Sequence, residues 1–190
     1  MAIALLLAGC SREAPDVREV RETAEGYFHA LVGRDVRGIA DRSTCLVSMN
    51  TVVGATILAI EPPRRVRMGV LDSLVSVSIR TQRSADSAWA YAGEENADSL
   101  FRQARLLSNR AAVYRNAARA VPLSAPGAVV PRDSTLETRV LRARFRYEGA
   151  AVGPRPVDRE ELVRMLRAPG GKWIVFSVYV REDDPAPEMN

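Results

Sequence analysis

The sequence predicts an α+β protein in which N-terminal helices pack on an antiparallel sheet and a long helical insertion lies in the middle, at about 64–121. Two patterns predict this class: apolar residues recur at helical spacing in 17–31 and in 100–121, whereas apolar and charged residues alternate in 141–147. The chain has 190 residues, of which 47% are hydrophobic and 26% are charged. This length and composition predict one globular domain, at 16–182, and exclude a disordered chain.

The first predicted helix begins at Asp16, because aspartate is a favoured N-cap and Glu19 follows at the capping-box position. Apolar residues continue at helical spacing to Leu31, and Gly33 ends the helix. A second, shorter helix is predicted at about 35–43. These two helices are the predicted N-terminal layer of the domain.

A strand and a series of helices are predicted next. Residues 51–60 are β-branched and apolar, so they predict a strand that the following two prolines end. Helical spacing then predicts helices at 66–83 and 84–92, and a longer helix at 96–121 that ends before Pro122.

The longest predicted helix carries a heptad-like seam, in which apolar and aromatic residues between Leu100 and Val121 follow one another at spacings of four and three. We expect this 100–121 seam to pack within the chain, in a helical hairpin or on the domain's own sheet. The alternative is that the seam mediates assembly with another chain.

The C-terminal part predicts three strands after a proline-rich surface connection at 122–134. Residues 141–147 alternate between apolar side chains and arginines, which predicts one buried and one solvated face. Two further strands are predicted at 157–167 and at 173–180, and the last of them is apolar on both faces, which predicts a central position in the sheet. Residues 183–190 are a predicted disordered tail.

The N-terminus carries the most specific signal in the sequence. An apolar run at 2–8 leads into Gly9 and Cys10, after which the chain becomes polar. The segment Leu7-Ala8-Gly9-Cys10 resembles the lipobox of bacterial lipoproteins. The resemblance implies that residues 1–9 are a signal peptide, that Cys10 is lipidated, and that residues 10–15 are a lipidated tether.

The lipobox resemblance also implies a location. A serine after the lipidated cysteine, here Ser11, is compatible with delivery to the outer membrane, so we expect a lipid-anchored domain in the cell envelope, facing the periplasm. No lysine or arginine precedes Arg12, although export signals begin with one, so we expect a signal peptide that is truncated at its start. The alternative is a short apolar segment that packs into the core and contains this motif by chance.

The two cysteines allow two interpretations. If Cys10 is lipidated, Cys45 remains as a single thiol, and its apolar neighbours predict that it is buried and inert. If Cys10 is not lipidated, a disulfide between Cys10 and Cys45 is the alternative. Two cysteines and one histidine lack the spacing of metal ligands, so we expect neither a metal site nor a cofactor.

Two segments near the ends of the domain carry a further resemblance. They are Tyr27-Phe28-His29-Ala30-Leu31-Val32-Gly33-Arg34-Asp35 and Gly170-Gly171-Lys172-Trp173-Ile174-Val175. Together with their surroundings, at 16–45 and 135–182, they resemble the NTF2-like (cystatin-like) superfamily. The resemblance implies a curved antiparallel sheet that wraps a long N-terminal helix to form a cone. Because the superfamily contains enzymes, binding modules and dimer scaffolds, it assigns no function by itself.

His29 is the only histidine, and Tyr27 lies two residues before it, so these are the candidate residues for a cone-shaped pocket. A histidine in such a pocket can act as a general base, but a packing or surface histidine is the favoured interpretation. The sequence contains no phosphate-loop, dinucleotide-binding or hydrolase motif. We therefore expect no catalytic residues and no enzymatic activity.

Arg142, Arg144 and Arg146 occupy every second position, so their side chains share one face of the predicted strand. One interpretation is a surface for anionic partners. The favoured alternative is a cross-strand ladder with the acidic residues at 158–161. The formal net charge is +4, but acidic residues are interspersed among the arginines, so nucleic acid is not an expected partner.

These features predict a membrane-anchored envelope lipoprotein that acts by binding or scaffolding rather than by catalysis. Its expected partners are the membrane, through the lipid anchor, and an envelope protein. One alternative is a small NTF2-like enzyme of the isomerase or dehydratase type. Another is a helical assembly protein that uses the 100–121 seam.

Overall fold

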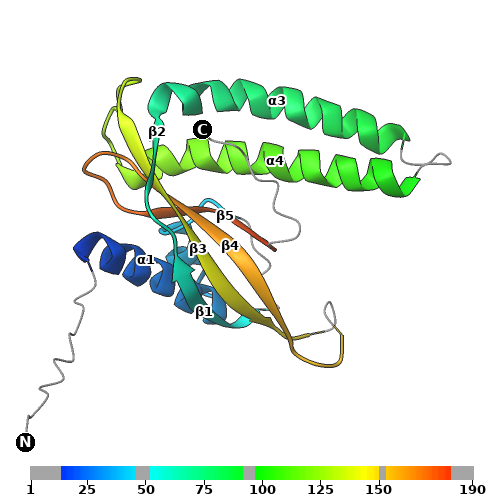
Figure 1. The fold of residues 1–190 in the computed structure, drawn as a ribbon, viewed down its shortest axis with the longest axis horizontal. Coiled ribbons are helices and arrows are strands. Elements are labelled where there is room, and N and C mark those ends of the chain that lie inside the picture. The colour runs from blue at the N-terminus through cyan, green and yellow to red at the C-terminus, as the bar shows by residue number, and fades with distance from the viewer. Residues whose placement is uncertain (1–13, 46–51, 92–96, 150–152, 181–190) are drawn as a thin grey trace, which may run out of the picture.

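The computed structural model describes residues 14–45, 52–91, 97–149 and 153–180. Within these ranges the chain is an α+β protein, as predicted, with a five-stranded antiparallel sheet (Figure 1). The predicted signal peptide and the tail at 183–190 lie outside the described residues. The elements are α1 (Pro15–Val32), α2 (Val36–Ala40), β1 (Val52–Ile60), β2 (Arg64–Arg67), α3 (Met68–Tyr91), α4 (Ala97–Ser124), β3 (Thr135–Tyr147), β4 (Val157–Arg167) and β5 (Ile174–Val180).

The sheet has the order β1-β3-β4-β5, and β2 also pairs with β3. β1 pairs with β3 from Leu141 to Tyr147, whereas β2 pairs with the first four residues of β3. Between β1 and β2 stand Pro62 and Pro63, which have no N–H to donate to a neighbouring strand. β1 and β2 are therefore two halves of one edge, separated by the prolines.

The two faces of the sheet contact different helices. Leu141, Ala143 and Phe145 of β3 belong to one buried core, together with Tyr27 and other residues of α1. Leu136 of β3 belongs to a second core, together with residues of α4. Because side chains alternate along a strand, α1 covers one face and α4 covers the other, as Figure 1 shows.

β5 lies at an edge of the sheet, so the predicted central position is wrong. Its apolar character has another cause: Val175 packs in the α1 core and Phe176 packs in the α4 core, so both faces are covered. The outer edge of β5 is also bonded, because Thr44 N donates to Val175 O and Val175 N donates to Arg42 O, each at 2.9 Å.

α3 and α4 form an antiparallel helical hairpin (Figure 1). The Nε1 atom of Trp89 lies 3.5 Å from Ser108 Oγ, and Arg115 Nη1 lies 3.5 Å from Gln82 Oε1. Fully buried alanines occupy the facing sides: Ala85, Ala104 and Ala111. Such small side chains allow two helices to approach closely. Part of the 100–121 seam therefore packs against α3 within the same chain.

Three boundaries in this region differ from the prediction. Residues 68–91 form one helix where two were predicted, and α4 continues through Pro122 to Ser124. A proline in the last turn removes only one backbone hydrogen bond, so the helix tolerates it there. Arg64–Arg67 is a strand rather than the start of the helical insertion, because it pairs with residues far along the chain that local sequence does not reveal.

Candidate functional site

The start of α1 is fixed to the sheet. The helix begins at Pro15 with Ala14 as its cap residue, so the predicted cap at Asp16 is wrong. Asp16 instead lies in the first turn, and its carboxylate binds the guanidinium of Arg139 on β3. The Arg139 side chain is only 4% exposed, and its Nη1 also donates to the carbonyl oxygen of Glu61 at 3.1 Å. The predicted lipidation site, Cys10, lies outside the described residues.

The structure separates the two predicted pocket residues. His29 is exposed and lines a groove of about 480 Å³ between α1 and residues 53–57 of β1. Tyr27 is fully buried in the α1 core. The two side chains point in opposite directions, because two positions along an α-helix differ by about 200°. They therefore do not meet in one pocket.

Tyr27 belongs to a buried polar cluster, which we define as Tyr27, Cys45, Tyr147 and Glu161. The Tyr147 hydroxyl donates to the Glu161 carboxylate, and Glu161 is only 4% exposed. The Tyr27 hydroxyl lies beside the Ser43 hydroxyl, but among the described residues it makes no hydrogen bond of normal geometry. Burial raises the pKa of Tyr27, of Tyr147 and of Glu161, and it raises the pKa of the free Cys45 thiol to about 12. Burial thus favours the neutral form of each group.

The buried polar cluster can perform two kinds of chemistry. When protonated, Glu161 could donate a hydrogen bond to a polar ligand or transfer a proton to it; when ionised, it accepts the hydrogen bond of Tyr147. A buried hydroxyl without a hydrogen bond, such as that of Tyr27, costs about 1–3 kcal/mol. A polar ligand that formed this hydrogen bond would recover that energy.

Glu161 is not among the predicted pocket residues, because the sequence predicts it as one of the acidic residues of a surface ladder. Alternation along β4 separates the pair Glu160 and Glu161: the carboxylate of Glu160 binds Arg142, whereas Glu161 lies on the side of the buried Val163 and Met165. The signal that could have found Glu161 is its period-two spacing from these two apolar residues.

The predicted arginine row faces acidic residues of its own chain. Arg142 Nε donates to Glu160 Oε1 at 2.7 Å, and this hydrogen bond raises the pKa of Arg142. Arg146 Nε lies 3.7 Å from Glu148 Oε1. Arg144 is exposed, and its cross-strand neighbour in β4 is Glu160. The row is therefore set among carboxylates that reduce its attraction for an external anion.

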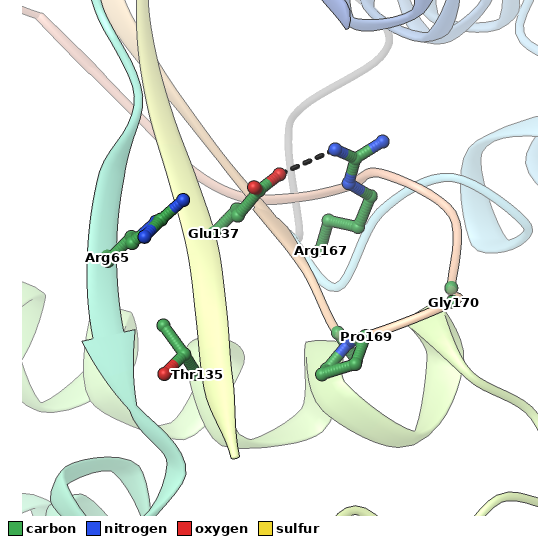
Figure 2. Close-up of a pocket in the computed structure, with 8 residues that line it drawn as sticks. Arg65, Thr135, Glu137, Arg167, Pro169 and Gly170 are labelled. Atoms are coloured by element: carbon green, nitrogen blue, oxygen red, sulfur yellow. Dashed lines mark hydrogen bonds and ion pairs between the residues drawn. The ribbon is translucent and has the colours of Figure 1, made fainter.

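A second groove, of about 360 Å³, lies between β2, the start of β3 and the turn that follows β4 (Figure 2). Arg167 organises one wall of this groove. Its Nη1 donates to Glu19 Oε2 at 2.6 Å, its Nη2 donates to Glu137 Oε2 at 2.5 Å, and its guanidinium carbon lies 4.7 Å from the centre of the Trp173 ring. Both carboxylates raise the pKa of Arg167 against the opposing effect of burial. Arg65 projects from β2 into the other side of the groove (Figure 2).

The turn that closes this second groove requires two glycines. Gly170 has a φ of +68°, a left-handed conformation that favours glycine, and a Cβ on Gly171 would lie 2.6 Å from the carbonyl oxygen of Ser124. Ser124 at the end of α4 holds the turn: its Oγ accepts from Ala168 N at 2.9 Å and donates to Lys172 O at 2.5 Å. The hairpin and the turn are thereby held together.

The comparisons with known proteins identify no relative. No protein-family model, no curated protein and no solved structure gives a significant match to this chain. Among the described residues, no three metal-binding side chains gather into a group that could hold an ion. None of the described helices combines the length and the hydropathy needed to cross a membrane.

Proposed function

We propose that this chain is a lipid-anchored protein of the cell envelope, held in the outer membrane and facing the periplasm, whose folded domain acts by binding. We also propose that the domain is an NTF2-like cone into which the α3–α4 hairpin is inserted. The observation that carries the proposed location is the segment Leu7-Ala8-Gly9-Cys10, which stands shortly before the first residue of α1.

The distance from Cys10 to the domain supports a membrane-proximal position. The predicted tether is residues 10–15, and because α1 already begins at Pro15, residues 10–14 are the part that precedes the helix. A fully extended chain spans at most about 3.6 Å per residue, which limits this tether to about 18 Å. An anchor at Cys10 would therefore keep the start of α1 close to the lipid head groups.

The packing of α1 supports an NTF2-like cone. One face of the sheet holds α1 along Leu141, Ala143 and Phe145, which matches a sheet that wraps its N-terminal helix. Register shifts interrupt β1 at two places and the pairing of β4 with β5 at one place. Such bulges bend strands and increase their twist, as a wrapped sheet requires.

The intact mass of the protein, isolated from the membranes of its native host, tests the anchor. We expect a species that begins at Cys10 and carries added acyl mass. The matched control is Cys10→Ala, which cannot be acylated, so its mass should include no acyl group. A wild-type species that retains residues 1–9 without acyl mass would refute the proposal.

Binding rather than catalysis is supported by the arrangement of the side chains. His29, the residue on which general-base chemistry depended, lines a groove that Tyr27 does not reach. The 100–121 seam gives little support to assembly, since Ala104 and Ala111 are fully buried within the hairpin.

A second candidate function, an enzyme of the isomerase or dehydratase type, is favoured by one observation: the buried polar cluster holds a carboxyl group with a raised pKa next to an unpartnered hydroxyl. This enzyme would use Glu161 rather than His29. Such an enzyme needs a pocket that small molecules can enter, and Cys45 belongs to the buried polar cluster that would line it. In the Cys10→Ala chain Cys45 is the only thiol, so it should react with a small thiol reagent faster than the domain unfolds. Labelling only at the rate of global unfolding would exclude an accessible pocket there.

A further inference from the structure

We propose that the exposed arginines of β2 and the second groove form a surface that binds the phosphate head groups of anionic lipids. The proposal rests on the lipid anchor for its setting, and it adds the surface by which the domain would contact the membrane. It differs from the sequence-based expectation, which placed an anionic surface at Arg142, Arg144 and Arg146.

The anchor-proximal end of α1 lies beside β2. Asp16 binds Arg139, and Arg139 also bonds the carbonyl oxygen of Glu61, which is the residue between β1 and the two prolines that precede β2. One turn further along α1, Glu19 binds Arg167 in the wall of the second groove. A chain anchored through the segment before Pro15 is therefore attached next to this surface.

The arginines of β2 are available to an external anion. Arg64, Arg65 and Arg67 are all exposed. Arg64 has a distant ion pair, at 4.0 Å from Glu61, and within the described ranges neither Arg65 nor Arg67 has a carboxylate within ion-pair distance. By contrast, Arg142 and Arg146 on the other face of the sheet have carboxylate partners at 2.7 and 3.7 Å.

The register places two of these arginines over the second groove. Arg65 pairs with Glu137 and Arg67 pairs with Thr135, so their side chains share the face of the sheet on which Thr135 and Glu137 line the groove. Figure 2 shows Arg65 and Thr135 on one side of the groove and Arg167 and Pro169 on the other. A phosphate group there can accept hydrogen bonds from the Arg65 guanidinium and the Thr135 hydroxyl.

The acidic residues near this surface all have arginine partners, although two of the carboxylates share one guanidinium. Glu137 and Glu19 both bind Arg167, and Asp16 binds Arg139. Among the described residues that line this surface, Arg65 and Arg67 have no carboxylate within ion-pair distance. Basic residues next to an anionic membrane contribute about 1 kcal/mol each, provided that they lie within a Debye length of about 8 Å. A tether of at most about 18 Å allows the domain to come within this distance of the membrane.

Flotation with lipid vesicles tests the proposal. The protein is the full chain carrying Cys10→Ala, so that binding does not depend on acylation. The vesicles are phosphatidylcholine, either alone or mixed with phosphatidylglycerol. The double substitution Arg65→Ala with Arg67→Ala should weaken partitioning onto the anionic vesicles about 30-fold, which corresponds to about 1 kcal/mol per arginine. Neutral vesicles should show no difference between the variants.

Arg144→Ala with Arg146→Ala is the matched control, because it removes the same charge from two exposed arginines on the opposite face. We expect this control to change partitioning less than about threefold, well under the effect expected for two membrane-facing arginines. Equal losses in the two double variants would overturn the proposal in favour of a net-charge effect. An unchanged Arg65→Ala with Arg67→Ala variant would also overturn it.

Two further measurements distinguish a lipid head group from a soluble phosphate, and the head-group surface from the lipid anchor. If the protein binds inorganic phosphate but does not partition onto the anionic vesicles, the groove is a site for a soluble anion and the lipid proposal fails. If the intact mass shows no acylation while the vesicle result holds, the anchor is refuted but the head-group surface is not. Circular dichroism checks that each variant is folded.

Discussion

Replacing Asp16 with asparagine is expected to destabilise the domain more than replacing its partner Arg139. Asp16 is 46% exposed, so its carboxylate remains hydrated when the arginine is removed. Arg139 is 4% exposed, and without Asp16 its guanidinium retains only the hydrogen bond to the carbonyl oxygen of Glu61. Removing the Asp16 carboxylate therefore leaves the buried Arg139 charge uncompensated, and breaking a buried pair in this way costs about 3–5 kcal/mol.

We expect Asp16→Asn to lower the free energy of unfolding by about 3 kcal/mol, the lower end of that range, because half-exposed Asp16 lets water approach. Arg139→Met removes the buried charge, its pairing with half-exposed Asp16 and its hydrogen bond to the Glu61 carbonyl, so its cost should be about 1 kcal/mol. For a domain of this size, 3 kcal/mol corresponds to a decrease in Tm of about 6–12 °C. The double variant should resemble Arg139→Met alone, since no buried charge is left to stabilise.

Urea unfolding followed by circular dichroism measures all three variants at neutral pH. Arg18→Ala is the control, because Arg18 and Glu22 form an exposed i,i+4 pair whose loss should cost less than about 0.5 kcal/mol. A larger cost for Arg139→Met than for Asp16→Asn would refute the reasoning, as would a double variant that is less stable than Asp16→Asn.

Three other substitutions have defined outcomes. Ala111→Leu places a large side chain between α3 and α4 and should cost about 1–3 kcal/mol, measured as a lower Tm. Ser124→Ala leaves the N–H of buried Ala168 without its acceptor and should cost about 1–3 kcal/mol in urea unfolding; an unchanged midpoint would show that the turn holds without it. Because burial raises the pKa of Glu161 above its unfolded value of about 4.3, the folded state keeps a proton that the unfolded state loses as the pH rises. Stability should therefore fall from about pH 4.3 toward the folded pKa, by at most about 1.4 kcal/mol per pH unit. Glu161→Gln should remove this part of the pH dependence, and identical pH profiles for the two proteins would contradict it.

The elements with regular periodicity were predictable from the sequence. The helical spacing of Val20, Ala24 and Leu31 marks the buried side of α1, and all three are fully buried. The alternation of Leu141, Ala143 and Phe145 with arginines marks the two faces of β3, and these three side chains are also fully buried. In both cases one face of a single element is buried, so the signal lies entirely in local spacing.

Elements that depend on a distant partner were not predictable in the same way. The strand Arg64–Arg67 has three arginines in four residues, and it exists because it pairs with the start of β3. The position of β5 at an edge was also predicted wrongly, since a strand covered on both faces looks the same in sequence whether it is central or peripheral.

The candidate sites also combine features that local spacing predicts with features that depend on distant partners. The spacing of Arg142, Arg144 and Arg146 established that they share a face, but only the register with β4 showed the acidic residues beside them. Arg65 also has an acidic cross-strand neighbour, Glu137, but Arg167 binds that carboxylate, and no local pattern encodes this contact.

The sequence by itself determined the fold class, the main helices and strands, and the lipobox-like segment at Leu7-Ala8-Gly9-Cys10, because periodicity and short motifs are properties of neighbouring residues. The tertiary structure alone decided which charges are paired and which are buried. Asp16 and Arg139 are 123 positions apart, and Glu19 and Arg167 are 148 apart. Contacts at such separations arise only when the sheet brings distant segments together, and these contacts determine which arginines remain available for binding.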